Sequence, residues 1–207
     1  MKEFLKKERY KRIMISAIVF FTLILLNYSN VFAENTVTYV ALPVKEVKQA
    51  YSNWCWAAGS ESILYYCSRY LGYGREATQW DIVKYIYGSY VNQGATLSDI
   101  QRALSYYGVG SSRMYPVSGN IIPYGQMCQQ IINLRSPIGI SVYNYGSHFV
   151  VGCGIFQYFN SVGYLVNCVI IMDPACGSVI TIEDNELRDN DNVWELMWAL
   201  RVYKPSS

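Results

Sequence analysis

The sequence predicts a domain of the α+β class in which a helical part precedes a sheet. Apolar residues recur with helical spacing between residues 54 and 134. From Pro137 onward, alternating and continuous apolar runs typical of strands replace this pattern. Because helices and strands are segregated along the chain, we expect a helical half over about residues 48–135 packed on an antiparallel sheet over about residues 136–204, with a cleft between them.

The first 33 residues are expected to be a signal peptide and not part of the fold. Six basic and two acidic side chains precede an apolar run from Ile13 to Leu26. Small residues end this leader, and cleavage is expected between Ala33 and Glu34. An uncleaved membrane anchor is the alternative, but a span needs about 20 apolar residues, and polar residues interrupt this run from position 27 onward. The sequence therefore predicts a secreted, extracellular domain over residues 34–207 with no stable membrane insertion after cleavage.

Removal of the leader changes the charge balance. The whole chain has 17 basic and 15 acidic residues, so the mature chain keeps 11 and 13 of them and has a net charge of about −2. No basic patch remains that would suggest nucleic acid as a partner. The remaining 174 residues suffice for one domain with its own core, and we expect a monomer.

The expected elements follow one another with short connections. An extended segment over residues 34–47 precedes the first helix, and Asn53 is expected to cap that helix, with orientation of the cleft as the alternative. The expected helices are Trp54 to Leu71, Gln79 to Tyr87, the cap Thr96 through Tyr107, and Tyr124 to Leu134. The expected strands lie near Ile138 to Tyr143, His148 to Phe156, Gly163 to Met172, Val179 to Ile182 and Val193 to Tyr203.

A linker and the inward face of the last strand are also predicted. Residues 108–122 are rich in Gly and Ser and are interpreted as a solvated linker between the halves, with contact to substrate as the alternative. Trp194, Leu196, Trp198 and Leu200 alternate along the last strand, so we expect them on one face, in the core.

The stretch Gln49 to Ala58, QAYSNWCWAA, predicts nucleophilic acyl transfer. A cysteine in the first turn of a helix is favoured as a thiolate, because the helix N-terminus carries partial positive charge. The backbone N–H of Cys55 and the side-chain amide of Gln49 are then two donors for the oxyanion formed when the thiolate attacks a carbonyl. Trp54 and Trp56 are expected to wall the site and exclude water.

A thiolate nucleophile needs a base, and His148 is the single histidine of the chain. A third group must hold the imidazole in the right tautomer, and Asp173, which ends a long apolar run, is the best candidate. A carboxylate at the end of a buried strand is costly unless it has a partner, and an imidazole N–H is a suitable one. Ser147, beside the histidine, is a further candidate for the substrate cleft.

These motifs resemble a known family. The Gln-x5-Cys-Trp element, the later Gly-Ser-His-Phe-Val-Val strand start and the final Asp-Pro are similar to bacterial secreted papain-like cysteine peptidases, in the branch with Asp as third triad member. Staphopain-like and bacteriocin-processing peptidases share this order. The resemblance covers about residues 45–203. It implies a papain-like fold, with Cys55 as nucleophile, His148 as base, Asp173 as orienting group and Gln49 in the oxyanion hole.

The same resemblance implies a secreted endopeptidase with a protein or peptide substrate and no cofactor. In papain the third residue is Asn, so plant-type substrate rules are not transferred. One alternative is an amidase or transglutaminase that uses the same triad on a non-protein or side-chain amide. Another is a non-catalytic secreted binding protein on the same scaffold.

Five cysteines remain besides the nucleophile, so they cannot all pair with one another. Packing and one or two disulfides stay open as alternatives in an oxidising compartment. Cys153 and Cys168 lie in adjacent predicted strands and are a candidate pair, whereas Cys67 is expected to be buried. For Cys128 and Cys176, both packing and disulfide formation stay open. No Cys-x2-Cys spacing occurs, so we expect no metal site.

Overall fold

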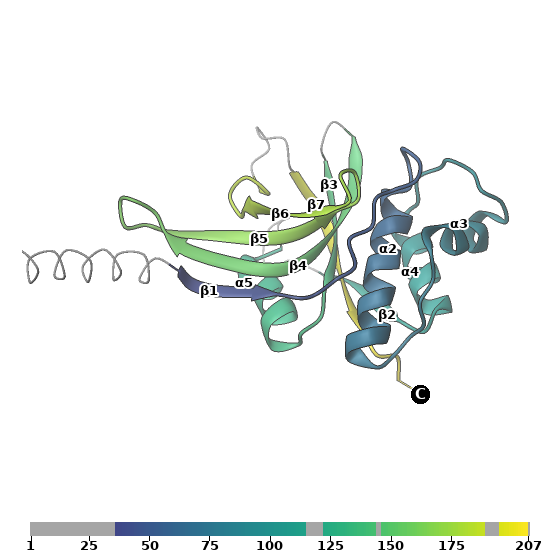
Figure 1. The fold of residues 1–207 in the computed structure, drawn as a ribbon, viewed down its shortest axis with the longest axis horizontal. Helices are drawn as coiled ribbons and strands as arrows, with labels where there is room; N and C mark the ends of the chain where they lie inside the picture. The colour runs from purple at the N-terminus through teal and green to yellow at the C-terminus, as the bar shows by residue number, and fades with distance from the viewer. Residues whose placement is uncertain (1–35, 115–121, 144–145, 189–194, 207) are drawn as a thin grey trace, which may run out of the picture.

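The structure is a computed structural model that describes residues 36–114, 122–143, 146–188 and 195–206 (Figure 1). The helices are α2 (Cys55–Tyr66), α3 (Gln79–Tyr87), α4 (Leu97–Tyr106) and α5 (Tyr124–Cys128), and the π-helical turns η1 (Cys67–Leu71) and η2 (Gln129–Asn133) continue α2 and α5. The strands are β1 (Thr36–Ala41), β2 (Gly110–Met114), β3 (Ile138–Tyr143), β4 (Ser147–Phe159), β5 (Leu165–Asp173), β6 (Ser178–Glu183) and β7 (Glu195–Tyr203). The helices α2 to α4 precede the main run of strands, so the predicted α+β class is confirmed.

The strands form one antiparallel sheet with the order β2-β7-β3-β4-β5-β6, and β1 also pairs with β4. The long strand β4 pairs with β3 through its first half and with β1 through its second half. Helices α2, α3 and α4 lie together at one end of the molecule, and β4 and β5 extend away from them (Figure 1). Helix α2 packs directly on β4.

The two faces of the sheet bury two separate apolar clusters. Phe149 and Val151 of β4 pack with the cluster of the α2–α4 face, which also holds Ile63 and Leu64 of α2. Val150, between them, belongs to the opposite cluster, together with Ile131 of η2. This alternation follows from the two-residue period of a strand. Residues 149–155 of β4 are therefore buried on both faces, directly after His148.

The predicted helices are present because their ends carry strong local signals. Thr78 and Asp81 form a capping box at the start of α3, and Gly88 ends that helix in the left-handed region. Thr96 and Asp99 form the same kind of box at the start of α4. The first predicted helix is confirmed through Leu71, although its last five residues form the π-helical turn η1.

Three sequence expectations are corrected by the structure. Residues 110–114 are not a linker but the edge strand β2, which pairs with β7. Leu196 and Trp198 do not share a face, because the pairing register of β3 and β7 shifts between them; Leu196 belongs to one core cluster, and Trp198 packs against the other. Asn53 does not cap α2, whose N-cap residue is Trp54 without a side-chain cap. Trp194 lies outside the described residues.

All six cysteines are free in the structure. Cys168 stands opposite Phe156 in the β4–β5 register, whereas Cys153 lies at the register shift near Gly152 and Gly154. The suggested Cys153–Cys168 pair is therefore not formed, because the two residues do not face each other. Cys67 is fully buried, as expected.

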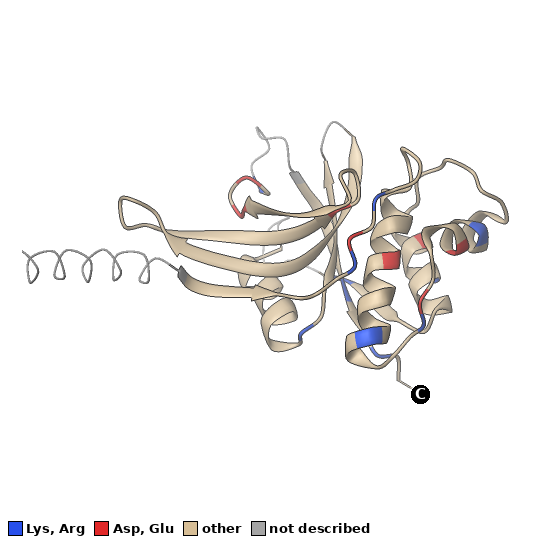
Figure 2. Ribbon diagram, in the orientation of Figure 1, with Lys and Arg blue, Asp and Glu red and all other residues tan. Residues whose placement is uncertain are grey.

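Few positions along the strands of the sheet are occupied by charged residues (Figure 2). Asp173 is the one Asp, Glu, Lys or Arg residue in β3, β4 and β5 taken together. The helical end of the molecule carries most of the coloured positions in the same view. Among the described residues there is no helix of the length and apolarity that a membrane crossing requires. The predicted leader lies outside the described ranges.

Candidate active site

Cys55 is the first residue of α2, and a neighbouring loop holds the two tryptophans that flank it. The indole Nε1 of Trp54 donates to the carbonyl of Val91 at 2.8 Å, and Nε1 of Trp56 donates to the carbonyl of Gln93 at 3.0 Å. Both indoles are buried, whereas Cys55 is half-buried. The two anchored rings fix the start of the helix and leave the residue between them accessible.

His148 and Asp173 come together because β4 and β5 are antiparallel neighbours. His148 lies at the start of β4, and Asp173 ends β5. Nε2 of His148 lies 2.7 Å from Oδ1 of Asp173. The backbone N–H of Ala175 donates to the same carboxylate oxygen at 2.8 Å. Strand pairing and the turn after β5 therefore hold the carboxylate against one ring nitrogen.

The side chain of Cys55 also hydrogen-bonds to the imidazole, and because Asp173 engages Nε2, we assign this contact to Nδ1. Burial lowers the pKa of His148, but hydrogen bonds and charges from Asp173 and Cys55 outweigh burial and raise the pKa to about 9. Burial raises the pKa of Asp173, but hydrogen bonds from His148 and Ala175 outweigh it and hold the pKa of this carboxyl below its usual range. The electrostatics of the site therefore favour a charged imidazolium beside a carboxylate.

A cavity of about 430 Å³ opens beside Cys55 and His148. The helical side contributes Ser52, Asn53, Trp56, Tyr87, Gln93, Gly94, Ala95, Thr96, Asp99 and Ile100, and the sheet contributes Ser141, Ser147, Phe149 and Trp198. The predicted cleft residues Trp56 and Ser147 thus line the cavity. Trp54 does not, because it is fully buried, with its ring tilted against Tyr51 and edge-on to Trp80. Its place is behind the cavity wall.

Gln49 lies next to the turn that carries Asp173, since its backbone N–H donates to the carbonyl of Pro174 at 2.9 Å. Its side-chain nitrogen donates to the carbonyls of Tyr51 and Ser52, at 3.0 and 2.8 Å. Its side-chain oxygen is buried without a hydrogen-bond partner. Gln49 does not line the cavity in this state, so a bond to an oxyanion requires its amide to release one of the two loop carbonyls.

The sequence does not predict the loop over residues 88–96 as part of the site. Gln93, Gly94 and Ala95 of this loop line the cavity, and Asn53 is tied to its centre by a bond from Nδ2 to the carbonyl of Asn92 at 3.1 Å. The available signal was indirect, since two buried indole N–H groups beside the cysteine require acceptors. Within the described ranges, no cluster of three or more His, Cys, Asp or Glu residues is arranged to hold a metal ion.

Residues 36–183 match the model of a family described as "Papain-like cysteine protease AvrRpt2". A comparison with curated proteins gave no match. One similar solved structure is a double glycine motif protease from an AMS/PCAT transporter in complex with the leader peptide. It is 19% identical, with a TM-score of 0.49, and the match covers 83% of this chain and 99% of that chain.

Proposed function

Because the chain belongs to the AvrRpt2 family of papain-like cysteine proteases, we propose that Cys55, His148 and Asp173 are its catalytic triad. The fold is papain-like, and the protein is a cysteine peptidase. The substrate in this proposal is a protein or peptide cleaved internally, bound in the cavity between the helices and the sheet. The chemistry needs no cofactor.

The proposed reaction starts from an ion pair in which the proton of the Cys55 thiol has already passed to Nδ1 of His148, as the raised pKa of this imidazole favours. The thiolate attacks the carbonyl carbon of the scissile bond, and the carbonyl electron pair moves to oxygen. The N–H of Cys55, in the first turn of α2, and the amide of Gln49 then donate to this oxyanion. When the tetrahedral intermediate collapses, the C–N bond breaks, and the imidazolium gives its proton to the leaving amine.

The second half of the proposed reaction hydrolyses the thioester. Water loses a proton to the neutral His148 and attacks the acyl carbon, and the C–S bond then breaks, which releases the acid and restores the Cys55 thiolate beside the protonated imidazole. Asp173 keeps Nε2 of the imidazole engaged through both halves and stabilises the imidazolium. It does not itself take up the proton.

One observation carries this proposal. The single histidine of the chain stands with Nε2 at 2.7 Å from Asp173, and its other side faces the cysteine at the start of α2. Asp173 is the one Asp, Glu, Lys or Arg residue in strands β3 to β5, and an imidazole between a carboxylate and a thiol is the arrangement that acyl transfer needs.

Alkylation and hydrolysis together test the assignment. We expect iodoacetamide near neutral pH to label Cys55 stoichiometrically and far faster than the other five cysteines. Cys55→Ala should abolish hydrolysis of a peptide library while the free energy of unfolding changes little. Gln49→Ala should lower turnover by about 10²-fold. Hydrolysis that survives in Cys55→Ala, or labelling of Cys55 no faster than in the unfolded chain, would contradict the assignment.

We further propose that the protein acts outside the cell as a monomer, after cleavage between Ala33 and Glu34. The basic start and the apolar run of the leader support export. N-terminal sequencing of exported protein is expected to begin at Glu34, and an intact leader on the exported chain would count against the proposal.

A further inference from the structure

The segment Lys45–Ala50, which we call the strap, crosses from the helices to the sheet and carries Gln49. On the helical side, Oγ of Ser62 donates to the carbonyl of Lys45 at 2.7 Å, and Nζ of Lys45 lies 2.6 Å from Oε1 of Glu61. On the sheet side, the N–H of Gln49 donates to the carbonyl of Pro174 at 2.9 Å. The strap therefore touches both halves that supply the proposed triad.

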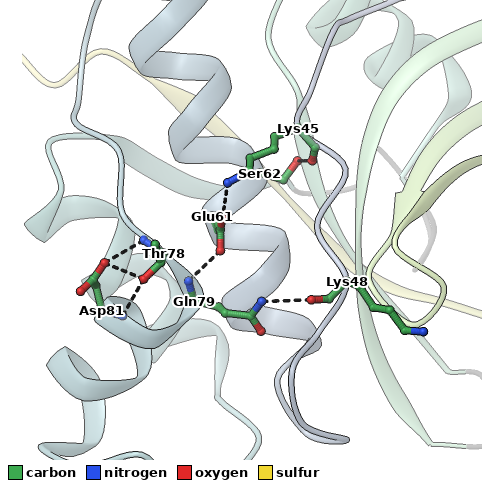
Figure 3. A network of polar contacts seen from close by, with 7 residues as sticks. All are labelled: Lys45, Lys48, Glu61, Ser62, Thr78, Gln79 and Asp81. Atoms are coloured by element: carbon green, nitrogen blue, oxygen red, sulfur yellow. Dashed lines mark hydrogen bonds and ion pairs between the residues drawn. The ribbon is translucent and has the colours of Figure 1, made fainter.

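The side chain of Gln79 holds the strap on either side of Gln49. Its Oε1 accepts from the N–H of Ala50 at 2.8 Å, and its Nε2 donates to the carbonyl of Lys48 at 3.0 Å. One primary amide thus pairs with a donor and an acceptor that flank a single residue (Figure 3 shows the bond to Lys48). Together with the bond to Pro174, these contacts fix the backbone before, at and after Gln49.

Gln79 is itself held firmly. It is the first residue of α3, is 7% exposed, and donates its own N–H to Oε2 of Glu61 at 2.8 Å (Figure 3). Glu61 lies on α2, six positions after Cys55, and is buried as well. The helix that bears the proposed nucleophile is therefore linked through Glu61 and Gln79 to the backbone that bears the proposed oxyanion donor.

We propose that Gln79 is a positioning residue of the peptidase, which acts by fixing the backbone of Gln49. This inference rests on the proposed function. A donor helps an oxyanion only when it stands at hydrogen-bond distance from the position that the oxyanion takes, and misplacement by about 1 Å is costly. Fixing Gln49 through its backbone leaves its side chain able to turn from the loop carbonyls to the substrate.

The test compares Gln79→Ala with Thr78→Ala. Both change the start of α3, but the side chain of Thr78 hydrogen-bonds to Asp81, whereas that of Gln79 hydrogen-bonds to the strap (Figure 3). We expect Gln79→Ala to lower kcat on a peptide substrate about tenfold with little change in KM, and Thr78→Ala to lower the melting temperature without this loss. Gln79→Met, which keeps the side-chain volume, should behave like Gln79→Ala even if the latter folds poorly.

A double-mutant cycle gives the sharper readout. In a Gln49→Ala background, Gln79→Met should lower kcat less than twofold, because the group that it positions has been removed. The alkylation rate of Cys55 by iodoacetamide should match the wild type in both Gln79 variants, since alkylation forms no oxyanion. Additive losses in the cycle, or alkylation slowed as much as kcat, would overturn the positioning role. Wild-type protein that alkylates rapidly at Cys55 but hydrolyses no peptide would instead overturn the proposed function and the inference together.

Discussion

The charge state of one imidazole governs the chemistry of the site. His148 is held between Asp173 and Cys55, and its pKa is raised to about 9, so the ring stays protonated well above neutral pH. The carboxylate that produces part of this effect is the one Asp, Glu, Lys or Arg in strands β3 to β5. The carboxylate of Asp173 therefore stabilises the protonated imidazole beside it.

Asp173→Asn should shift the alkaline limit of activity to a lower pH. The wild-type limb of kcat/KM is expected near pH 9, because activity needs the imidazolium and is lost as pH rises through that pKa. Loss of the carboxylate lowers the pKa of His148 toward the usual value of about 6.5, so we expect kcat/KM at pH 8 to fall about tenfold. The measurement is a pH–rate profile.

Asp81→Asn is the matched control for this profile. Asp81 also has a lowered pKa, caused by hydrogen bonds from Thr78, but it lies at the start of α3 and does not line the cavity. Its loss should reduce stability and leave the alkaline limb in place. An alkaline limb that stays near pH 9 in Asp173→Asn would show that the carboxylate does not control the imidazole.

The contact between α2 and β4 brings the proposed nucleophile to the proposed base. Gly59, four positions after Cys55, lies against Phe149, the residue after His148. A Cβ at position 59 would stand 2.6 Å from Cδ1 and 2.7 Å from Cε1 of this ring. The absence of a side chain at Gly59 therefore sets how closely the two elements approach.

Gly59→Ala should reduce both stability and activity. The new methyl group pushes against the Phe149 ring, which is 3% exposed, and overpacking of this kind costs about 1–3 kcal/mol, more than alanine gains in helix propensity. Urea unfolding measures the stability, and kcat measures the displacement of His148. Gly125→Ala is the control, because that helical position has open space around it. Equal effects of the two substitutions would contradict the close-packing argument.

Sequence patterns predicted the elements that have local signals. The bounds of α3 agree to the residue because a capping box and a glycine mark its two ends. Strand β2 was missed because its Gly- and Ser-rich sequence has weak strand preference, and only pairing with β7, far along the chain, makes it a strand. Leu196 and Trp198 were wrongly expected on one face of β7, because an extra residue between them, Met197, interrupts the two-residue period of the strand.

The candidate site likewise has parts that the sequence predicts and parts that depend on the folded structure. The Cys55, His148 and Asp173 cluster was predictable, because a single histidine left one base to choose and a buried acid needed a partner. The present orientation of the Gln49 amide was not, since it depends on two carbonyls of its own loop. The role of Gln79 could not be predicted either, because its side chain bonds to backbone atoms, which are present at every position whatever the sequence.

In the whole molecule, the imidazole and the carboxylate couple the folding stability to pH. The folded-state pKa of His148 lies above its unfolded value of about 6.5, so its contribution is complete below pH 6.5 and is lost as pH rises through about 9. The folded-state pKa of Asp173 lies below its unfolded value of about 3.9, so its contribution is present above that pH and is lost as pH falls. The pair therefore stabilises the fold most between about pH 4 and 6.5.

The difference in unfolding free energy between the wild type and His148→Gln isolates this contribution. Burial also raises the pKa of Cys67 and Cys153, so other groups destabilise the fold at high pH, but they are common to both proteins and cancel in the difference. We expect urea unfolding to give a difference that falls by roughly 2–3 kcal/mol from pH 6 to pH 9.5. A difference that is constant over this range would mean that folding does not raise the pKa of His148. In that case the imidazolium is not maintained between Asp173 and Cys55, and the basis of the alkaline activity limit is removed with it.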